Sequence, residues 1–133
     1  YGFIELKNSK KIDKVIMCSG KIYFDLLEAR EKYKKNNIVL IRIEQLYPFP
    51  IKSLVKELKP YKKNAKFYWC QEEPKNMGAW FSVRDYIQWT LDYIKANNRE
   101  ISYIGRSPDA TPATGYVKRH LAQQKEIIDK VFN

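Results

Sequence analysis

The sequence predicts an α/β domain built on an open, mostly parallel sheet with helices on both faces. Segments with strand-like and helix-like patterns alternate four times along the chain, which is typical of parallel strands joined by helices. The run Ile38–Ile43 is apolar at five of its six positions, so both faces of that strand must be covered. Right-handed crossovers then bring the turns that follow the strands to one rim of the sheet.

Length and composition fit one packed domain. The chain has 133 residues, of which 44% are hydrophobic and 14% aromatic, enough to bury a core without disulfides or metals. Residues 14–133 are predicted to form the domain, and residues 1–13 the remnant of a linker. Because the chain begins with Tyr1 and not with methionine, we interpret it as a piece of a longer polypeptide.

The cysteines and the hydropathy indicate the compartment. Cys18 and Cys70 lie in apolar runs and have no C-x-x-C context, which predicts core residues in a reducing compartment. The chain has neither an apolar run as long as a membrane span nor a signal peptide at its start, so we expect no membrane partner.

The net charge of +10 comes mostly from lysine. This charge has two interpretations. The first is a surface that binds a polyanion, and the second is a solvated surface with lysines clustered in the turns after helices. We favour the second, because the aromatic residues that would stack on bases lie in the apolar runs. Nucleic acid is therefore not the expected partner.

Lys14–Cys18 is the first predicted strand, and Ser19-Gly20-Lys21 is a tight turn into a helix. Apolar residues at helical spacing, widened by Tyr23 and Leu27, define the buried face of this helix: Ile22, Leu26, Ala29 and Tyr33. After the second strand, Pro48 and Pro50 stiffen the connector. The next predicted helix covers Ile51–Leu58 and ends at Pro60.

The second half repeats the alternation. Ala65–Cys70 is the third predicted strand, followed by an acidic loop, Gln71–Pro74. The long helix after Gly78 is predicted to bury one face: Trp80, Val83, Ile87, Leu91 and Ile94. Ile101–Ile104 is the fourth strand, and a loop over 105–115 leads to the last helix. Its apolar positions are Val117, Leu121, Ile127, Ile128 and Val131.

Cations on the predicted rim are the main candidates for binding. Lys21 follows a flexible turn at a helix start, where free amides attract anions, and Ser19 supplies a hydroxyl. Arg42 and Arg106 come at the ends of two other strands. Together these residues could clamp a phosphate or carboxylate. The alternative is that the arginines pair with Glu44, Glu72 or Glu73, and the two readings can coexist.

No catalytic set is complete in the sequence. Glu72 and Glu73 are adjacent and should point to opposite faces of a strand, which favours interface or ion-pair roles. His120 is the only histidine and has no nucleophile partner in sequence. Its spacing from the cysteines does not match a metal site, so no metal ligand is assigned. The Gly-Asp-Gly of a thiamine diphosphate signature does not occur.

Four motifs carry a resemblance to a known family. They are V-I-M-C-S-G-K-I-Y-F-D-L-L at 15–27, I-R-I-E-Q-L-Y-P-F-P at 41–50, W-C-Q-E-E-P-K-N-M-G-A-W at 69–80 and Y-I-G-R at 103–106 with the loop after it. In this order they closely resemble the C-terminal domain of the E1 component of 2-oxoglutarate dehydrogenase, over nearly the whole chain.

The resemblance implies a transketolase C-terminal-like fold, a three-layer sandwich. It implies a parent enzyme that decarboxylates 2-oxoglutarate with thiamine diphosphate and magnesium and passes the succinyl group to the lipoyl arm of the E2 succinyltransferase. The cofactors would lie in preceding domains, so this fragment should bind none and be inactive alone. The parent would reside in the bacterial cytoplasm or the mitochondrial matrix.

The resemblance also implies partners and sites. The domain would support the homodimer, contacting the preceding E1 domains and the second E1 subunit. Interface candidates from these motifs are Tyr47, Phe49, Glu72, Glu73 and Trp80, and we expect Tyr47, Phe49 and Trp80 to be exposed. An acetyl-CoA or AMP-type effector would bind at Ser19, Lys21, Arg42 and Arg106. The alternatives are a free-standing basic nucleotide- or RNA-binding module, or the same domain of a transketolase or branched-chain E1.

Overall fold

The fold is a parallel sheet of four strands in the order β2-β1-β3-β4. The computed structural model describes residues 11–44, 46, 48–106 and 117–133, with the side chains of the last segment described from residue 121. The strands are β1 (Lys14–Cys18), β2 (Ile38–Arg42), β3 (Lys66–Pro74) and β4 (Ile101–Arg106). Each pairs in parallel with its neighbours, so the predicted open parallel sheet is confirmed.

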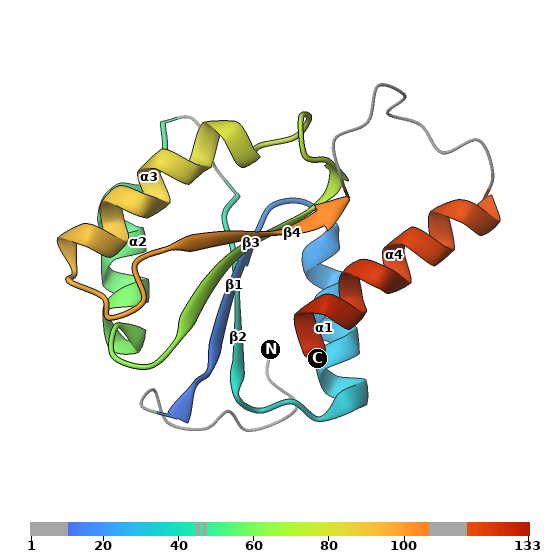
Figure 1. Cartoon of the computed structure of the whole chain (residues 1–133), viewed down its shortest axis with the longest axis horizontal. Helices are drawn as coiled ribbons and strands as arrows, with labels where there is room; N and C mark the ends of the chain where they lie inside the picture. The colour runs from blue at the N-terminus through green and yellow to red at the C-terminus, as the bar shows by residue number, and fades with distance from the viewer. Residues whose placement is uncertain (1–10, 45, 47, 107–116) are drawn as a thin grey trace.

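Helices cover both faces of the sheet and make three layers (Figure 1). They are α1 (Ile22–Tyr33), α2 (Ile51–Leu58), α3 (Trp80–Tyr93) and α4 (Val117–Phe132). Helices α2 and α3 lie together on one face, and α1 and α4 on the other. The predicted bounds of α2 are confirmed, and Pro60 lies in the short 3₁₀ turn that follows it, Lys59–Tyr61, because proline cannot continue an α-helix.

Two apolar clusters, one on each face of the sheet, form the core. The first joins alternate residues of the strands to α2 and α3, including Trp69, Leu58 and Ile87. The second joins the other strand residues to α1 and α4, including Leu26 and Val131. The alternation of strand side chains between the faces places Val15 and Met17 in one cluster and Ile16 and Cys18 in the other. Burial of both faces is therefore confirmed.

The buried face predicted for α3 is confirmed at every position, but two positions predicted to be buried in other helices are exposed. Tyr33 is 44% exposed at the end of α1, where its ring meets Phe132 at 6.1 Å between centroids. Leu121 is 62% exposed on α4; of the α4 side chains that the structure describes, Ile127, Val131 and Phe132 belong to the core, and the side chain of Val117 lies outside the described residues.

Strand β3 is longer than predicted. The residues expected to form an acidic loop, Gln71–Pro74, continue the strand. They remain extended because β4 pairs with β3 as far as Pro74 and Arg106, with an irregularity in register between Cys70 and Pro74. The rim on this side of the sheet therefore begins several residues later than the hydrophobic pattern indicated. The lead-in is described only from Lys11, and Ile12 is buried in the core.

Candidate functional site at the carboxyl rim of the sheet

The turn from β1 into α1 places Lys21 on the carboxyl rim. Gly20 has φ +84, a left-handed conformation that glycine adopts without strain, and this lets the chain turn directly from Cys18 into the helix at Ile22. Lys21 occupies the position before α1, and its side chain is 75% exposed. Ser19 is half-buried beside it.

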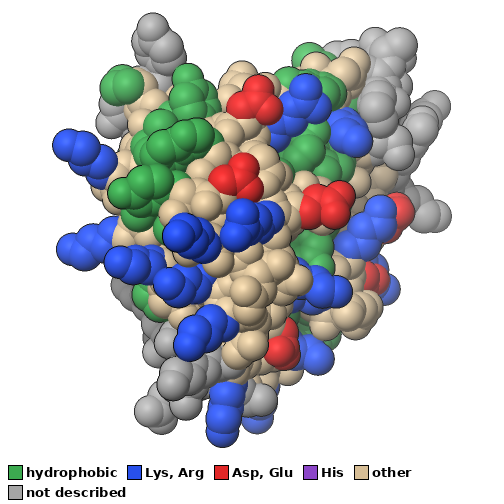
Figure 2. Space-filling view, turned by 60° about the vertical axis from the view of Figure 1, so that its left-hand side comes forward, with side chains coloured by type: hydrophobic (Ala, Val, Ile, Leu, Met, Phe, Trp, Pro, Cys, Tyr) green, Lys and Arg blue, Asp and Glu red, His purple; other side chains and the backbone are tan. Residues whose placement is uncertain are grey.

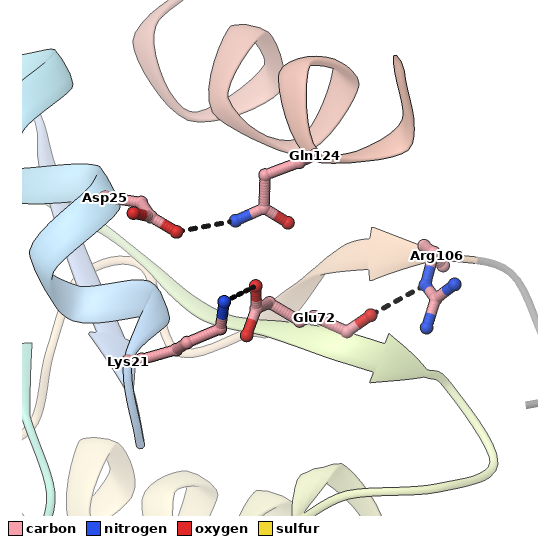
Figure 3. Close-up of polar contacts among 5 residues, drawn as sticks. All are labelled: Lys21, Asp25, Glu72, Arg106 and Gln124. Carbon is pink, nitrogen blue, oxygen red and sulfur yellow. Dashed lines mark hydrogen bonds and ion pairs between the residues drawn. The ribbon is translucent and has the colours of Figure 1, made fainter. Parts of the chain in front are cut away.

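Glu72 lies between two of the predicted cations (Figure 3). Its Oε1 is 4.0 Å from the Nζ of Lys21, while Arg106 donates from Nε to the backbone oxygen of Glu72 at 2.7 Å. A second nitrogen of Arg106 donates to Gln123 Oε1 at 3.0 Å. Glu72 Oε1 is buried and accepts no hydrogen bond from any described residue. The carboxylate therefore partly neutralises the cations that were expected to bind an anion.

Arg42 lies at the end of β2, on the far side of β1 from Glu72 and Arg106. It pairs with Glu44 at 3.2 Å, and its guanidinium lies over the ring of Phe24 at 5.0 Å from the centroid. The expected placement of all three cations at strand carboxyl ends is confirmed. The ion-pair alternative is confirmed for Arg42 and Glu44, and each of the three cations already has an acceptor in the chain.

A groove of about 570 Å³ between α1 and α4 opens onto these residues. Lys21, Asp25 and Glu72 are among the residues that line it, and the amide of Gln124 donates to Asp25 Oδ2 at 3.0 Å across it (Figure 3). Exposed Leu121 and the ring of Tyr33 provide apolar walls. The groove therefore offers both charges and apolar surface to a ligand.

Gln71 organises the loop from β3 into α3, and sequence reasoning missed it. Its buried amide oxygen accepts from Trp69 Nε1 at 3.0 Å and from the backbone N–H of Trp80 at 3.1 Å. Its nitrogen donates to the backbone oxygens of Glu73, Pro74 and Met77 at 3.1, 3.0 and 2.8 Å. One side chain thus satisfies five buried or partly buried groups. The sequence feature that could have indicated this role is a glutamine placed directly after the apolar strand residues that end at Cys70.

A second cleft, of about 630 Å³, lies where β1 and β3 send their chains to opposite faces of the sheet. Ser19 and Gly20 line one wall, and Gln71, Ser82 and Tyr86 line the other. In open α/β sheets such a crevice is a common binding position.

The two thiols at this end of the sheet are buried and unsuited to catalysis. Cys18 and Cys70 are register partners on neighbouring strands, and both are free. Burial raises the pKa of Cys18 to about 12, although Arg42 opposes the shift. Burial also raises the pKa of Cys70, with Cys18 and the nearby glutamates adding to the effect. Both cysteines therefore stay protonated at neutral pH and act as core residues, as predicted.

The expected interface residues have different environments. Phe49 is half-buried, and its ring stacks on Tyr86 at 5.0 Å; Glu73 is exposed, and Tyr47 lies outside the described residues. The expectation that Trp80 is exposed is wrong, because it is 7% exposed. Its ring packs against Tyr103 at 5.4 Å as part of the α3 core face.

An aromatic surface on α3 was not predicted. It consists of Phe81, Tyr86, Trp89 and Tyr93, which are 44 to 63% exposed, and Trp89 stacks on Tyr93 at 5.1 Å. Figure 2 shows a patch of hydrophobic side chains on the side of the molecule that bears α2 and α3. The spacing Tyr86, Trp89, Tyr93, away from the buried face of the same helix, is the signal that could have identified it.

The described residues contain no group of three His, Cys, Asp or Glu side chains placed to hold a metal ion. The side chain of His120 lies outside the described residues. No helix within the described ranges has the length and apolar character needed to cross a membrane.

Comparison with known proteins identifies the family. The family described as 2-oxoglutarate dehydrogenase C-terminal matches residues 3–132. The 2-oxoglutarate dehydrogenase E1 components of Brucella anthropi and Brucella ovis are each 49% identical over 120 residues, covering 90% of this chain and 12% of theirs. Among solved structures, "Split gene transketolase, inactive beta4 tetramer" matches with a TM-score of 0.59 at 12% identity, covering 98% of this chain and 42% of that one. The fold is thus transketolase-like, and the chain belongs to the 2-oxoglutarate dehydrogenase C-terminal family.

Proposed function

We propose that this chain acts as the C-terminal, non-catalytic domain of a 2-oxoglutarate dehydrogenase E1 protein. The parent would decarboxylate 2-oxoglutarate with thiamine diphosphate and magnesium, and pass the succinyl group to the lipoyl arm of an E2 succinyltransferase. Family membership supports this assignment. The chain spans about an eighth of the length of the curated relatives it matches, so the cofactors are assigned to other domains of the parent. The buried, protonated thiols fit that division.

The observation that carries the assembly role is the aromatic surface of α3. Soluble domains seldom expose several large aromatic side chains side by side, and such patches commonly mark protein interfaces. Trp and Tyr dominate the energetics of many interfaces because they bury a large area at small entropic cost. We propose that the preceding E1 domains cover this surface and thereby support the homodimer with a second E1 subunit, in a reducing compartment such as the bacterial cytoplasm or mitochondrial matrix.

The assembly role is tested with the substitutions Trp89→Ser and Tyr93→Ser. Both side chains are half or more exposed, so the isolated chain should unfold at nearly the same denaturant concentration. The full-length parent should lose dimer stability, measured by sedimentation. Phe24→Ser, an equally exposed aromatic on α1, is the matched control. If the parent with both substitutions assembles like the control, the α3 surface is not an interface.

The proposal that this domain is non-catalytic is tested with the isolated chain. It should show no turnover of 2-oxoglutarate when thiamine diphosphate and Mg²⁺ are added, measured by release of carbon dioxide. Turnover above the rate without protein would contradict a non-catalytic domain.

We also propose that an anionic effector such as AMP or acetyl-CoA binds at the rim. The exposed ammonium of Lys21 and the guanidinium of Arg106, on either side of Glu72, support this site. The amides near Lys21 and Arg106 should shift in an NMR titration with either compound, and Lys21→Gln should weaken the binding. Shifts confined to other parts of the sheet would place the effector elsewhere.

A further inference from the structure

The positive charge of the chain is concentrated at the edge of the sheet opposite the rim. In this fold the helices run antiparallel to the strands, so the helix ends and strand starts meet at the amino edge (Figure 1). We define the basic edge by the cationic residues found there: Lys11, Lys14, Lys32, Lys34, Lys35, Lys59, Lys62, Lys63, Lys66, Lys95 and Arg99. They outnumber the carboxylate side chains of the same edge, which are Asp13, Glu31, Glu57, Asp92 and Glu100. The last turn of α4 adds one charge of each sign, Asp129 and Lys130.

Residues of the basic edge lie close enough to affect one another. The pKa of Lys14 is lowered, first by partial burial and then by the charges of Lys35 and Lys66. These three lysines come from the start of β1, the end of α1 and the start of β3. Figure 2 shows a group of Lys and Arg side chains below the hydrophobic patch, on the side that bears α2 and α3.

Two lysines of the edge occupy positions that favour glycine. Lys34 and Lys95 follow α1 and α3 with φ of +52 and +58, in the left-handed conformation that usually ends a helix at glycine. Their backbone amides close the helices, as Lys34 N–H donates to Glu31 and Lys95 N–H to Asp92. A cation there is favoured by the helix dipole, yet the backbone is strained. At two positions of this edge, therefore, the chain has a lysine where a glycine would adopt the same backbone conformation without strain.

Hydrogen bonds join two of the basic segments into one rigid platform. The amide side chains of Asn97 and Asn98 donate to the backbone oxygens of Lys63, Asn64 and Ala65, at 2.9 to 3.3 Å. The backbone N–H of Asn97 donates to Lys62 at 2.8 Å. The loop after α3 is therefore fixed to the loop before β3, and a polar notch of about 420 Å³ between them is lined by Lys66, Asn98 and Arg99.

We propose that the basic edge is a docking surface for an acidic segment of a partner protein. Complementary charge is what this edge offers, since its exposed ammonium groups outnumber its exposed carboxylates on a preorganised platform. Nucleic acid is less favoured, because Arg99 is the one exposed arginine among the cationic residues that define this edge. Tyr33 contacts Phe132 and Tyr68 lies under Lys14, whereas Tyr93, at the end of α3, is 63% exposed; a single-stranded RNA is therefore included in the test.

The proposal is tested with the 133-residue chain and a fluorescein-labelled peptide of twelve glutamates, by fluorescence anisotropy at about 20 mM and about 150 mM salt. Binding should weaken at the higher salt, because exposed ion pairs are screened. Lys59→Glu/Lys63→Glu reverses two exposed charges of the edge and should weaken binding about tenfold or more. Lys52→Glu/Lys125→Glu makes the same charge change away from the edge and should have a much smaller effect.

A second pair of substitutions separates binding from folding. Lys34→Gly/Lys95→Gly relieves both left-handed positions, so the melting temperature should rise by about 2 to 5 °C per site, while affinity for the peptide falls. A more stable chain that binds the peptide unchanged would overturn the proposal.

Three other outcomes would overturn it too. They are absence of peptide binding at low salt, equal losses in the edge and control variants, and tighter binding of a single-stranded RNA of equal charge. None of these measurements depends on E1 activity, so their failure is distinguishable from failure of the proposed function.

Discussion

Gln71 shows how one side chain can hold a rim together. Its amide satisfies two N–H groups and three carbonyl oxygens around the start of α3. Gln71→Leu keeps the volume but leaves these groups without their partner, and buried unsatisfied groups cost about 1–3 kcal/mol each. Because several of these groups lose their partner together, we expect the free energy of unfolding to fall by about 3 kcal/mol or more in urea titration. Gln124→Leu, at the more exposed contact with Asp25, is the control and should change it by less than about 1 kcal/mol.

Cys18 and Cys70 should resist thiol reagents. Both are fully buried with raised pKa values, and only the thiolate is a good nucleophile. Folded protein at pH 8 should react with a disulfide reagent at the rate of global unfolding, and denatured protein at once. Rapid modification of the native protein would mean that these strands open locally.

At the residue level the sequence located the rim cations and named their acidic competitors. Arg42 with Glu44 is an ion pair two residues apart, which local sequence can predict. The ion pair of Lys21 with Glu72 joins the turn after β1 to β3, which are neighbours only because of the strand order, and that order is not predictable from local sequence. The five hydrogen bonds of Gln71 depend on the loop between β3 and α3 folding back over its side chain. No local sequence pattern predicts that loop conformation.

Among the elements, β4 packs against β3 with no room for one more carbon at Gly105. A Cβ there would lie 2.5 Å from Tyr103 Oη and 2.7 Å from the backbone oxygen of Gln71. Gly105→Ala should therefore destabilise the fold by about 2 kcal/mol or more, because backbone atoms must move. Gly20→Ala is the comparison, since a Cβ there meets nothing within 4 Å and its φ of +84 should cost about 1 kcal/mol. If the two variants lose the same free energy of unfolding in chemical denaturation, steric overlap at Gly105 costs no more than the backbone strain at Gly20.

Elements were predicted best where the hydrophobic period was unbroken. The core face of α3 and the bounds of α2 followed from spacing alone. The pattern failed for the end of β3, because charged residues continue the strand where β4 covers its edge. It also failed for the outer face of α3, because aromatic residues there were not distinguished from core. Burial is a property of the assembled layers, and an aromatic residue fits either side of a helix.

For the whole molecule, stability should fall at alkaline pH. Burial raises the pKa of Cys18 and of Tyr103 to about 12, and also raises those of Cys70 and Tyr61. A group whose pKa is raised in the folded state stabilises it fully below the unfolded value, near pH 9 to 10, and less as the pH rises towards the folded one. Lys14, with a lowered pKa, works in the opposite direction.

The free energy of unfolding, measured in urea between pH 8 and pH 11, should therefore decline with pH. Cys18→Ala/Cys70→Ala should flatten the slope even if it lowers stability at pH 8. An unchanged slope in this variant would assign the decline to the tyrosines.

The position of β1 has a consequence for synthesis on the ribosome. It precedes the other three strands of this sheet along the chain, yet it lies inside the sheet, between β2 and β3. Translation supplies β2 soon after it, but the other side of β1 stays unpaired until β3 has emerged from the exit tunnel. Nascent chains that stop before residue 66 therefore present an open strand edge, and such edges recruit chaperones or other strands.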